Sequence, residues 1–387
     1  MEALEGLDRI SILPQNITEK ILILLPIPDA LKTSILSRKW RYCWASIPVL
    51  TFNDQMFEGS SSSGIQNMSQ KLDTVYQVLL QHKSPLVGFT LSIELEMVSK
   101  VDQIVSYVVS RCNSTLKNVS ILNRTSSPNN HYKLPCSFFS LGGLEQLELV
   151  RCDFEPPPNF TGFPSLRWLS FFNTVISAKM LKHFLTLCPR VDELFLIGLQ
   201  EEDFRREDTF TFVELFELLP SIKVLALSKY YFWYFASGNM PKKLPISLVH
   251  LKILFLGVFF LDPVEVSSTL WLIKSSPNLK ELMLKLHPPP IPMDNIIVNI
   301  GLQDHTGFNL DNLEELGMYS FSNLPIEMEF MKLIMANSSA LKKVLVELDE
   351  NVSVDQEVEM YRDLIWKPFP RASPSAELII QRPKTSD

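Results

Sequence analysis

The chain has 387 residues, a formal net charge of −7 and 20% charged residues, the composition of an ordinary folded protein with two or three domains or one long repeat array. This acidic balance argues against non-specific nucleic-acid binding. The longest apolar run, Ile253 to Leu261, is about half of the roughly 20 residues that span a membrane. With no secretory signal at the N-terminus, we expect no membrane partner and a location in the cytoplasm and/or nucleus.

The first patterned stretch, residues 8–52, predicts a module of three short helices. Pro14 suits a first helical turn, and apolar residues then recur at three- and four-residue steps. We expect Pro26 and Pro28 to end this helix and Asp29 to cap a second one. A third helix is expected to begin near Ser37. Its predicted apolar face consists of Leu36, Trp40 and Trp44.

The apolar surface of this module has two interpretations. Domains of about 45 residues rarely bury enough surface to be stable without a metal, disulfide or partner. The helices therefore either cap the domain that follows or dock on another protein. Spacing alone does not separate the two, because helical apolar stripes are found both in cores and at interfaces.

The identity of the residues adds a resemblance. Leu13-Pro14, Leu25-Pro26-Ile27 and Thr33 to Arg41 closely resemble the F-box of plant F-box proteins. The resemblance implies docking on a Skp1-like adaptor and, through it, on a cullin-RING ubiquitin ligase. The residues that it implies for adaptor binding or for the module core are Leu13, Pro14, Ile17, Ile21, Leu22, Leu25, Pro26, Leu36, Trp40 and Trp44.

Residues 53–71, with the tract Gly59 to Gly64, predict a flexible linker. The amphipathic stretch Leu72 to Leu80 predicts the helix that opens the next domain, expected over 72–312. From there an apolar phrase of the form L-x-x-L-x-L recurs at intervals of 22 to 34 residues, which is typical of leucine-rich repeats. The phrases are Leu116 to Ile121, Leu144 to Leu149, Leu166 to Phe171, Val191 to Leu196, Ile222 to Leu227, Leu251 to Leu256, Leu279 to Leu284, Leu313 to Met318 and Leu341 to Val346.

Each phrase predicts a short strand, and the segments between phrases predict helices at Lys179 to Cys188, Thr211 to Leu219, Val264 to Lys274 and Ile326 to Met335. The fold class is therefore α/β: a three-helix module followed by an irregular solenoid in which each unit buries its face on its neighbours. The turn-closing Asn or Cys of such repeats is recognisable at Cys152 and absent from most other phrases.

The last segment, 313–381, carries a second resemblance. Glu327 to Lys332, Leu341 to Val344 and Phe369 to Leu378 look like the FBD segment of plant F-box/FBD/LRR proteins. A terminal repeat has to cover its open end, so Ala376 to Gln381 is predicted as a capping strand. Residues 382–387 are expected to form a frayed tail.

Side chains that alternate with the buried leucines predict a row along one face of the strands: Glu148, Ser170, Phe195, Ala226, Phe255 and Met283, with Trp168 beside it. The aromatic run Tyr230 to Phe235 is expected in a loop next to this row. Such aromatics either pack under loops or serve as binding hot spots. The candidate substrate-binding residues are Trp168, Phe195, Phe255, Met283, Tyr231 and Trp233.

Catalysis has no support in this sequence. It contains no phosphate-binding glycine loop, dinucleotide fingerprint or nucleophile elbow, and its histidines and cysteines lack metal-ligand spacing. The acidic run Glu201 to Asp203 and its neighbours Arg205 to Asp208 are expected to form a solvated loop. We expect no cofactor, no metal and no enzymatic activity.

The resemblance implies a substrate-recognition subunit of an SCF-type ubiquitin ligase, in which the module binds the adaptor and the solenoid recruits a protein substrate of unknown identity. Two alternatives stay open. One is a non-catalytic repeat scaffold that is not coupled to degradation. The other is a small-ligand receptor of the F-box/LRR type.

Overall fold

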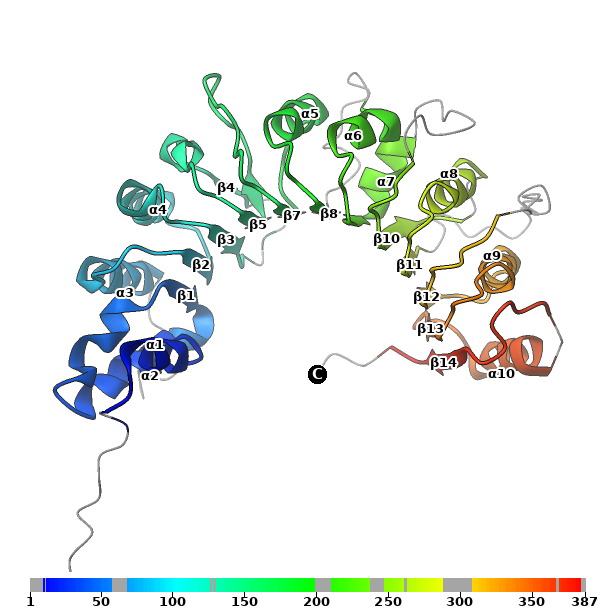
Figure 1. The fold of residues 1–387 in the computed structure, drawn as a ribbon, viewed down its shortest axis with the longest axis horizontal. Helices are drawn as coiled ribbons and strands as arrows, with labels where there is room; N and C mark the ends of the chain where they lie inside the picture. Colours follow the sequence, from blue (N-terminus) through cyan, green and yellow to red (C-terminus); the bar gives the residue numbers. More distant parts are fainter. Residues whose placement is uncertain are drawn as a thin grey trace, which may run out of the picture. The chain divides into compact units, whose positions relative to one another are not determined.

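The computed structural model describes residues 10, 12–57, 68–125, 127, 130–198, 210–236, 247–260, 263–287, 308–366 and 369–383. They fall into two compact units, residues 1–176 and 177–387, here called the N-terminal and C-terminal units. In each unit, parallel strands form a sheet with helices along one face (Figure 1). The face of each sheet turned away from these helices is called the open face.

The N-terminal unit contains the helical module and a sheet with strand order β1-β2-β3-β5-β7, beside the short pair β4-β6. Its helices are α1 (Gln15–Ile23), α2 (Ile27–Lys32), α3 (Met68–Gln81) and α4 (Val98–Cys112), with 3-10 turns η1 (Thr33–Ile35), η2 (Trp40–Ser46), η3 (Asp54–Phe57) and η4 (Cys136–Ser140). Its strands are β1 (Val49–Asn53), β2 (Gly88–Ile93), β3 (Asn118–Asn123), β4 (Tyr132–Lys133), β5 (Gln146–Val150), β6 (Cys152–Asp153) and β7 (Trp168–Phe172).

The C-terminal unit continues the strand-and-helix alternation in the order β8-β9-β10-β11-β12-β13-β14. Its strands are β8 (Glu193–Ile197), β9 (Val224–Leu227), β10 (Ile253–Val258), β11 (Glu281–Leu286), β12 (Glu315–Phe321), β13 (Lys343–Leu348) and β14 (Glu377–Gln381). Its helices are α5 (Ala178–Leu187), α6 (Phe212–Leu218), α7 (Lys229–Ala236), α8 (Pro263–Lys274), α9 (Pro325–Ala336) and α10 (Val354–Tyr361), and α10 runs into a π-helical turn, Arg362–Trp366.

The apolar phrases fold as strands because their leucines point to one side. Leu251 ahead of β10 and Leu254 and Leu256 within it are all completely buried, while Ile253 and Phe255 are only half-buried. All nine predicted phrases form strands, and the predicted helices at 179–188, 211–219, 264–274 and 326–335 correspond to α5, α6, α8 and α9. The repeat prediction is therefore confirmed at every position where it was made.

Two further phrases were missed. Ile47 to Phe52 forms β1 and Leu86 to Leu91 precedes and forms most of β2, and the two strands pair in parallel register. Both segments have the L-x-x-L-x-L spacing of apolar residues seen in the other phrases, so the sequence contained the pattern that predicts these two strands. Because β1 lies inside the stretch 8–52, the end of the helical module is also the first strand of the sheet.

The helical module differs from its prediction in three details. Its third helix is the 3-10 turn η2, which starts at Trp40 rather than near Ser37. Leu36 therefore does not share a face with Trp40 and Trp44: Leu36 is 58% exposed, whereas both tryptophans are buried. Pro28 lies in the first turn of α2 instead of ending α1, because a proline at that position loses no helical hydrogen bond.

Asp29 is not the cap of α2 either. Pro26 occupies the N-cap position without a side-chain hydrogen bond, and Asp29 lies in the first turn. There its carboxylate pairs with Lys32 at 2.9 Å. A carboxylate in a first turn is favoured by the helix dipole, which explains why the sequence pattern looked like a cap.

Three different side chains close the strand-to-helix turns of the N-terminal unit by hydrogen bonding to backbone groups. Asn123 is the last residue of β3, and Cys152 and Thr174 come two residues after β5 and β7, respectively; all three are buried, with their polar atoms bonded to backbone groups. The Asn123 Oδ1 accepts from the Leu95 N–H at 3.1 Å, and the Thr174 Oγ1 donates to the Leu149 carbonyl at 3.0 Å. Turn closure was recognised at Cys152 alone because the other side chains and offsets vary.

The last strand, β14, pairs in parallel with β13, as expected for residues 376–381. Arg382 is not frayed, since its guanidinium binds the Glu357 carboxylate at 2.7 Å. The assignment of 313–381 as an FBD segment stays a prediction. The tract 59–64, the acidic run 201–208 and residues 384–387 lie outside the described residues.

Candidate functional site

Helix α1 turns most of its apolar residues away from the protein. Thr18 and Leu22 form its buried side, while Ile17, Ile21 and Leu25 are each 36–38% exposed and Leu24 is 84% exposed. The stripe predicted from the three- and four-residue steps is therefore a surface and not a core. Amphipathic helices normally bury such a stripe, so its exposure here makes it a candidate protein interface.

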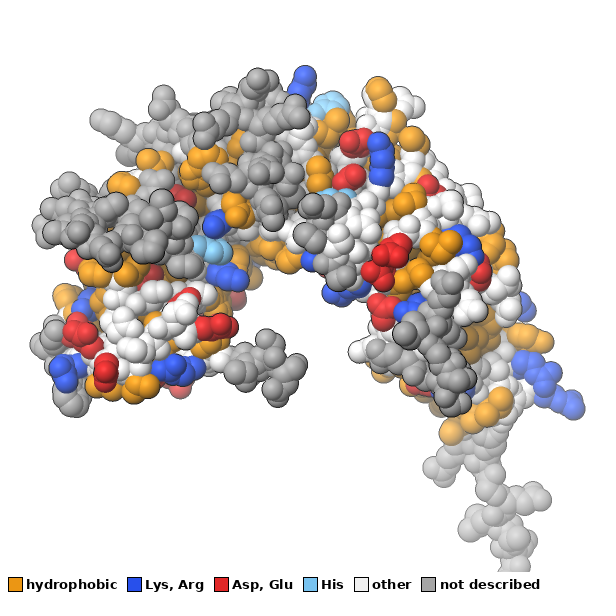
Figure 2. Space-filling model, turned by 180° about the vertical axis from the view of Figure 1, so that it is seen from behind, with side chains coloured by type: hydrophobic (Ala, Val, Ile, Leu, Met, Phe, Trp, Pro, Cys, Tyr) orange, Lys and Arg blue, Asp and Glu red, His pale blue; other side chains and the backbone are white. Residues whose placement is uncertain are grey.

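The rest of the module adds to this surface. Ile35 and Leu36 on and after η1 are 86% and 58% exposed, and Ile12 ahead of α1 is 65% exposed. Ten of the nineteen large apolar side chains exposed in the described part of the chain belong to residues 10–42. Figure 2 shows apolar side chains at the surface of this module, at the lower right of the view. The exposed set is called the module patch and consists of Ile10, Ile12, Ile17, Ile21, Ile23, Leu24, Leu25, Ile35, Leu36 and Tyr42.

The ten residues that the sequence offered for adaptor binding or module core now divide by burial. Leu22, Trp40 and Trp44 are at most 6% exposed and form the core. Ile17, Ile21, Leu25, Leu36, Pro14 and Pro26 are exposed, and Leu13 is half-buried. The core is closed by hydrogen bonds between distant segments: the Trp40 Nε1 donates to the Ile10 carbonyl at 3.3 Å, and the Lys39 Nζ donates to the Leu13 carbonyl at 2.8 Å.

The module is fixed to the first repeat at the end of α3. The His82 Nε2 lies 2.8 Å from the Ile47 carbonyl, and the Lys83 N–H donates to the Ala45 carbonyl at 2.7 Å. Burial lowers the pKa of His82, helped by the nearby Arg111 charge, so the imidazole is held neutral and donates through Nε2. The module thus caps the repeats through these contacts, and docking on another protein stays a prediction for the exposed side of α1.

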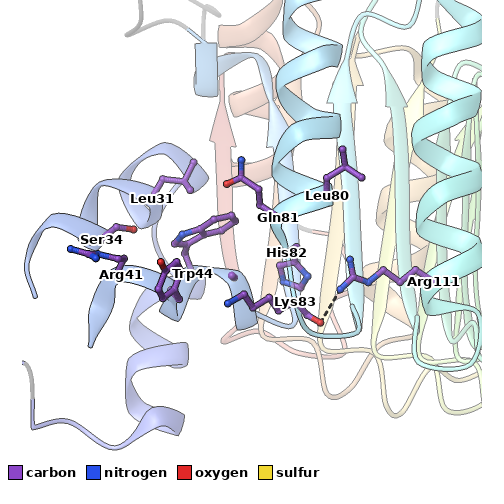
Figure 3. Close-up of a pocket in the computed structure, with 11 residues that line it drawn as sticks. Leu31, Ser34, Arg41, Trp44, Leu80, Gln81, His82, Lys83 and Arg111 are labelled. Carbon is purple, nitrogen blue, oxygen red and sulfur yellow. Dashed lines mark hydrogen bonds between the residues drawn. The ribbon is translucent and has the colours of Figure 1, made fainter. Parts of the chain in front are cut away.

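A groove of about 770 Å³ lies beside this junction (Figure 3). Leu31, Trp44 and Leu80 contribute apolar walls, and Lys83 and Arg111 lie at its edge. The Arg111 guanidinium donates to the Lys83 carbonyl at 2.8 Å and to the Tyr107 hydroxyl at 2.9 Å. Arg111 is therefore engaged in holding the ends of α3 and α4 together.

The open face of the C-terminal unit carries the apolar part of the predicted row. The strand register aligns Phe195 with Ala226, Phe255 and Met283, as side-chain alternation predicted. The row continues through Gly317, Leu345 and Ile379. This set of seven registered positions is called the apolar row. Ala226 and Gly317 are buried and the other five side chains are half-buried.

Gly317 keeps the apolar row continuous. A Cβ atom there would come within 2.5 Å of the Met283 Sδ, so only glycine lets the Met283 side chain lie across β12. The Tyr319 hydroxyl closes over the same sulfur at 3.6 Å. Met283 is thus held flat against the sheet between Phe255 and Leu345, and the row forms a connected apolar strip.

The predicted row has a different character in the N-terminal unit. There the register aligns Thr51, Thr90, Ser120, Glu148 and Ser170, which are all polar. Trp168 lies two residues before Ser170 on β7 and is half-buried, in a parallel row with Gln146 and Asn118. Within its own unit, Trp168 therefore has polar register partners and not aromatic ones.

The prediction for Tyr230 to Phe235 was wrong in its local structure. These residues form α7 rather than a loop, and α7 packs against β10 and α8. Tyr231 is completely buried, so it is not a surface residue, while Trp233 on the same helix is 38% exposed. Phe232 and Phe235 pack on Phe212 with ring centroids 5.6 and 5.5 Å apart, because a helix of this composition can bury three of its rings at once.

A row of charged side chains borders the apolar row on the open face. Two residues before each apolar position, the register aligns Glu193, Val224, Ile253, Glu281, Glu315, Lys343 and Glu377, here called the acidic row. Among the described residues, no ion pair neutralises its four carboxylates. The sequence reasoning missed this row because it considered only the position next to the last leucine of each phrase.

The neighbouring charges are paired. One residue earlier in each phrase, Asp192 binds Lys223 at 2.6 Å, and Glu314 binds both Lys280 at 3.0 Å and Lys342. These two lysines lower the pKa of Glu314 through their hydrogen bonds and charges. The sheet thus pairs the charges of Asp192 and Glu314, whereas in the described structure the carboxylates of the adjacent acidic row have no ion-pair partner.

Within the described ranges, no three His, Cys, Asp or Glu side chains are grouped to hold a metal ion. The same part of the chain contains no helix with the length and apolar content needed to cross a bilayer.

Comparison with known proteins agrees with this architecture. Residues 10–52 match the F-box domain family, and residues 105–207 match the LRR repeats of the FBD-associated F-box protein At5g56370. The Arabidopsis thaliana F-box/FBD/LRR-repeat protein At1g13570 is 28% identical over 97% of this chain and 99% of its own length. The chain is thus similar to a plant F-box/FBD/LRR-repeat protein over nearly its whole length, and its N-terminal segment matches the F-box domain.

Other relatives match over shorter stretches. The F-box/FBD/LRR-repeat protein At4g00160 of Arabidopsis thaliana is 28% identical over 58% of this chain and 47% of its own length. The putative F-box/FBD/LRR-repeat protein At5g52460 of the same plant is 32% identical over 45% of this chain and 41% of its own length. In this chain the F-box match ends at residue 52, inside β1. No enzymatic family is indicated by these matches.

Proposed function

We propose that this protein is the substrate-recognition subunit of an SCF-type ubiquitin ligase. The F-box module would dock on a Skp1-like adaptor through the module patch, and the repeats would hold the protein to be ubiquitylated. The observation that carries the proposal is the outward apolar stripe of α1, because exposed apolar surface of this extent marks protein interfaces. Ligase chemistry would belong to other subunits.

The burial pattern supports separate roles for two sets of apolar residues in the module, one in its core and one on its surface. Its core residues Leu22, Trp40 and Trp44 are fully used in holding the helices together. Ile17, Ile21 and Leu25 contribute little to that core and share the free side of α1. Large apolar side chains at the centre of such a surface are the residues expected to supply most of the binding energy.

The test is a double substitution, Ile17→Asp with Leu25→Asp, followed by capture on a purified Skp1-like adaptor. We expect affinity to fall about 100-fold or more, because two central apolar contacts are replaced by charges that the interface has to desolvate. Both side chains are exposed in the free protein, so the melting temperature should be nearly unchanged. The measurement is titration calorimetry or surface plasmon resonance.

The matched control is Val354→Asp, which makes the same kind of change at a 68% exposed side chain on α10. It should leave adaptor affinity unaltered. Equal adaptor binding by the double variant and the wild type would show that the module patch is not the docking surface. Exchange of Leu13 and Pro14 is less discriminating, because Pro14 occupies the N-cap position of α1 and the Leu13 carbonyl accepts from Lys39.

The alternative of a scaffold uncoupled from degradation predicts a different outcome in reconstitution. If the chain binds the adaptor but no bound protein becomes ubiquitylated when cullin, RING subunit and charged conjugating enzyme are added, the scaffold interpretation is favoured. Ubiquitin transfer that disappears with Ile17→Asp and Leu25→Asp supports the receptor.

A further inference from the structure

The open face of the C-terminal unit carries the apolar row and the acidic row side by side. The apolar row crosses seven registered strands, with Phe195, Phe255, Met283, Leu345 and Ile379 half-buried. The acidic row runs parallel to it, two residues earlier on the same strands. Along these strands the half-buried positions of both rows alternate with the buried leucines and valines, so the two rows share the open face of the sheet. Figure 1 shows the helices on the other face.

The carboxylates of the acidic row are not placed for the stability of the fold. Glu281 and Glu315 are direct register partners on β11 and β12, where neighbouring strands are about 4.8 Å apart. Like charges directly opposite each other destabilise a sheet. Lys343 is the register partner of Glu315, yet no ion pair joins them in the described structure.

The residues one position before the acidic row show that this sheet can neutralise its carboxylates by ion pairs with lysines. Asp192 and Glu314 are each bound by lysines of neighbouring strands. The contrast within one sheet is informative, because both lines have the same spacing and the same backbone. Carboxylates left unpaired beside an apolar strip attract a cation that brings apolar surface with it.

We propose that the open face of the C-terminal unit binds a protein segment rich in both basic and large apolar side chains. Its apolar residues would cover Phe255, Met283 and Leu345, while its Lys or Arg side chains would reach Glu281 and Glu315. This inference names the substrate class for the proposed receptor. It rests on the proposed function only in that the bound segment would then be ubiquitylated.

The experiment uses the full-length chain and three fluorescent synthetic peptides of equal length, rich in Lys and Leu, in Glu and Leu, or in Lys and Ser. Fluorescence anisotropy should show the Lys/Leu peptide binding about tenfold or more tightly than the other two, because only it supplies both charge and apolar contact. Its affinity should weaken as salt is raised, since Glu281 and Glu315 are only half-buried and dissolved ions can screen their charges.

The decisive variant is Glu281→Lys with Glu315→Lys, which should weaken Lys/Leu binding about tenfold or more. Phe255→Ser tests the apolar row separately and should weaken the same peptide without changing its salt dependence. The matched control is Glu359→Lys, the same charge reversal on the exposed side of α10, which should leave affinity nearly unchanged. Thermal melting of each variant verifies its folding.

Three outcomes would overturn the inference: equal binding of the three peptides, undiminished binding by the Glu281→Lys, Glu315→Lys chain, or the same loss in Glu359→Lys. Adaptor capture on the same preparations separates this failure from failure of the proposed function. If adaptor binding is intact while peptide selectivity is absent, only the inference fails. If peptide selectivity is present without adaptor binding, only the receptor function fails.

Discussion

Glu327 is a buried carboxylate at the first turn of α9, only 4% exposed. It accepts the Ser322 and Leu324 N–H groups at 3.0 and 3.1 Å, which stops the backbone donors before the helix from being left without partners. Burial raises its pKa to about 7, with a smaller contribution from Asp349, and the backbone donors offset only part of this effect. The charged form is therefore costly in the folded protein.

This residue makes the stability of the C-terminal unit depend on pH. Between the ordinary pKa of 4.5 and about 7 the folded chain keeps the Glu327 proton and the unfolded chain releases it, so stability falls as pH rises through this range. Glu327→Gln should abolish the dependence and raise the unfolding free energy at pH 8 by up to about 3 kcal/mol. Urea denaturation at several pH values measures this.

The control for that experiment is Glu329→Gln, on the exposed side of the same helix. It should reproduce the wild-type pH profile. An unchanged profile in Glu327→Gln would mean that the two backbone N–H groups stabilise the carboxylate enough to cancel its burial.

At the scale of elements, β1 links the F-box module to the repeats. It pairs with β2 over Val49 to Asn53, and His82 secures the turn ahead of it by donating to the Ile47 carbonyl. Because the folded-state pKa of His82 is lowered below 6.5, the unfolded chain takes up a proton that the folded chain refuses as pH falls. The contribution of His82 to the stability of the folded protein is complete above pH 6.5 and is lost as the pH falls below this value.

We expect this anchor to be visible in hydrogen exchange. His82→Ala should speed exchange of the β1 and β2 amides at pH 8, and it should reduce the extra loss of protection that the wild type shows on going to pH 5.5. Exchange measured by mass spectrometry, corrected for the intrinsic rates at each pH, tests both. His250→Ala, at an exposed histidine of the C-terminal unit, is the control. Protection of β1 that is identical in the wild type and His82→Ala would contradict the anchor.

At the scale of the whole molecule, the two candidate surfaces share no residue and belong to different units. Ile17 and Leu25 lie in the N-terminal unit, and Phe255, Glu281 and Glu315 lie in the C-terminal unit. Substitutions at distant sites without common partners usually act independently. The two binding activities should therefore be separable by point substitutions.

Proximity labelling in plant cells checks this independence. Proteins labelled by the wild-type chain through its open face should persist with Ile17→Asp and Leu25→Asp, and adaptor and cullin should disappear. Glu281→Lys with Glu315→Lys should give the reverse. Deletion of residues 1–52 is a poorer tool, because it removes most of β1 and exposes the edge of β2. Loss of both sets of proteins in either variant would contradict independent surfaces.

The amino-acid sequence by itself determined the repeat architecture and the F-box character of the chain. Each phrase, such as Leu251 to Leu256, carries its strand signal locally, since alternation within six residues decides which side chains point inward. The alignment of Phe195, Phe255 and Met283 in the apolar row followed from the same alternation of side chains. Local signals of this kind survive in any tertiary context that buries one face.

Only the tertiary structure decided which apolar residues are core and which are surface. Leu22 and Ile21 are neighbours on α1, and only Leu22 is buried, because α1 packs one of its sides against η2, a segment that begins 18 residues after Leu22. Tyr231 and the acidic row depended likewise on neighbours roughly 30 residues distant in sequence, as solenoid packing requires. Burial and charge pairing are properties of such long-range neighbours, so spacing within one repeat cannot determine them.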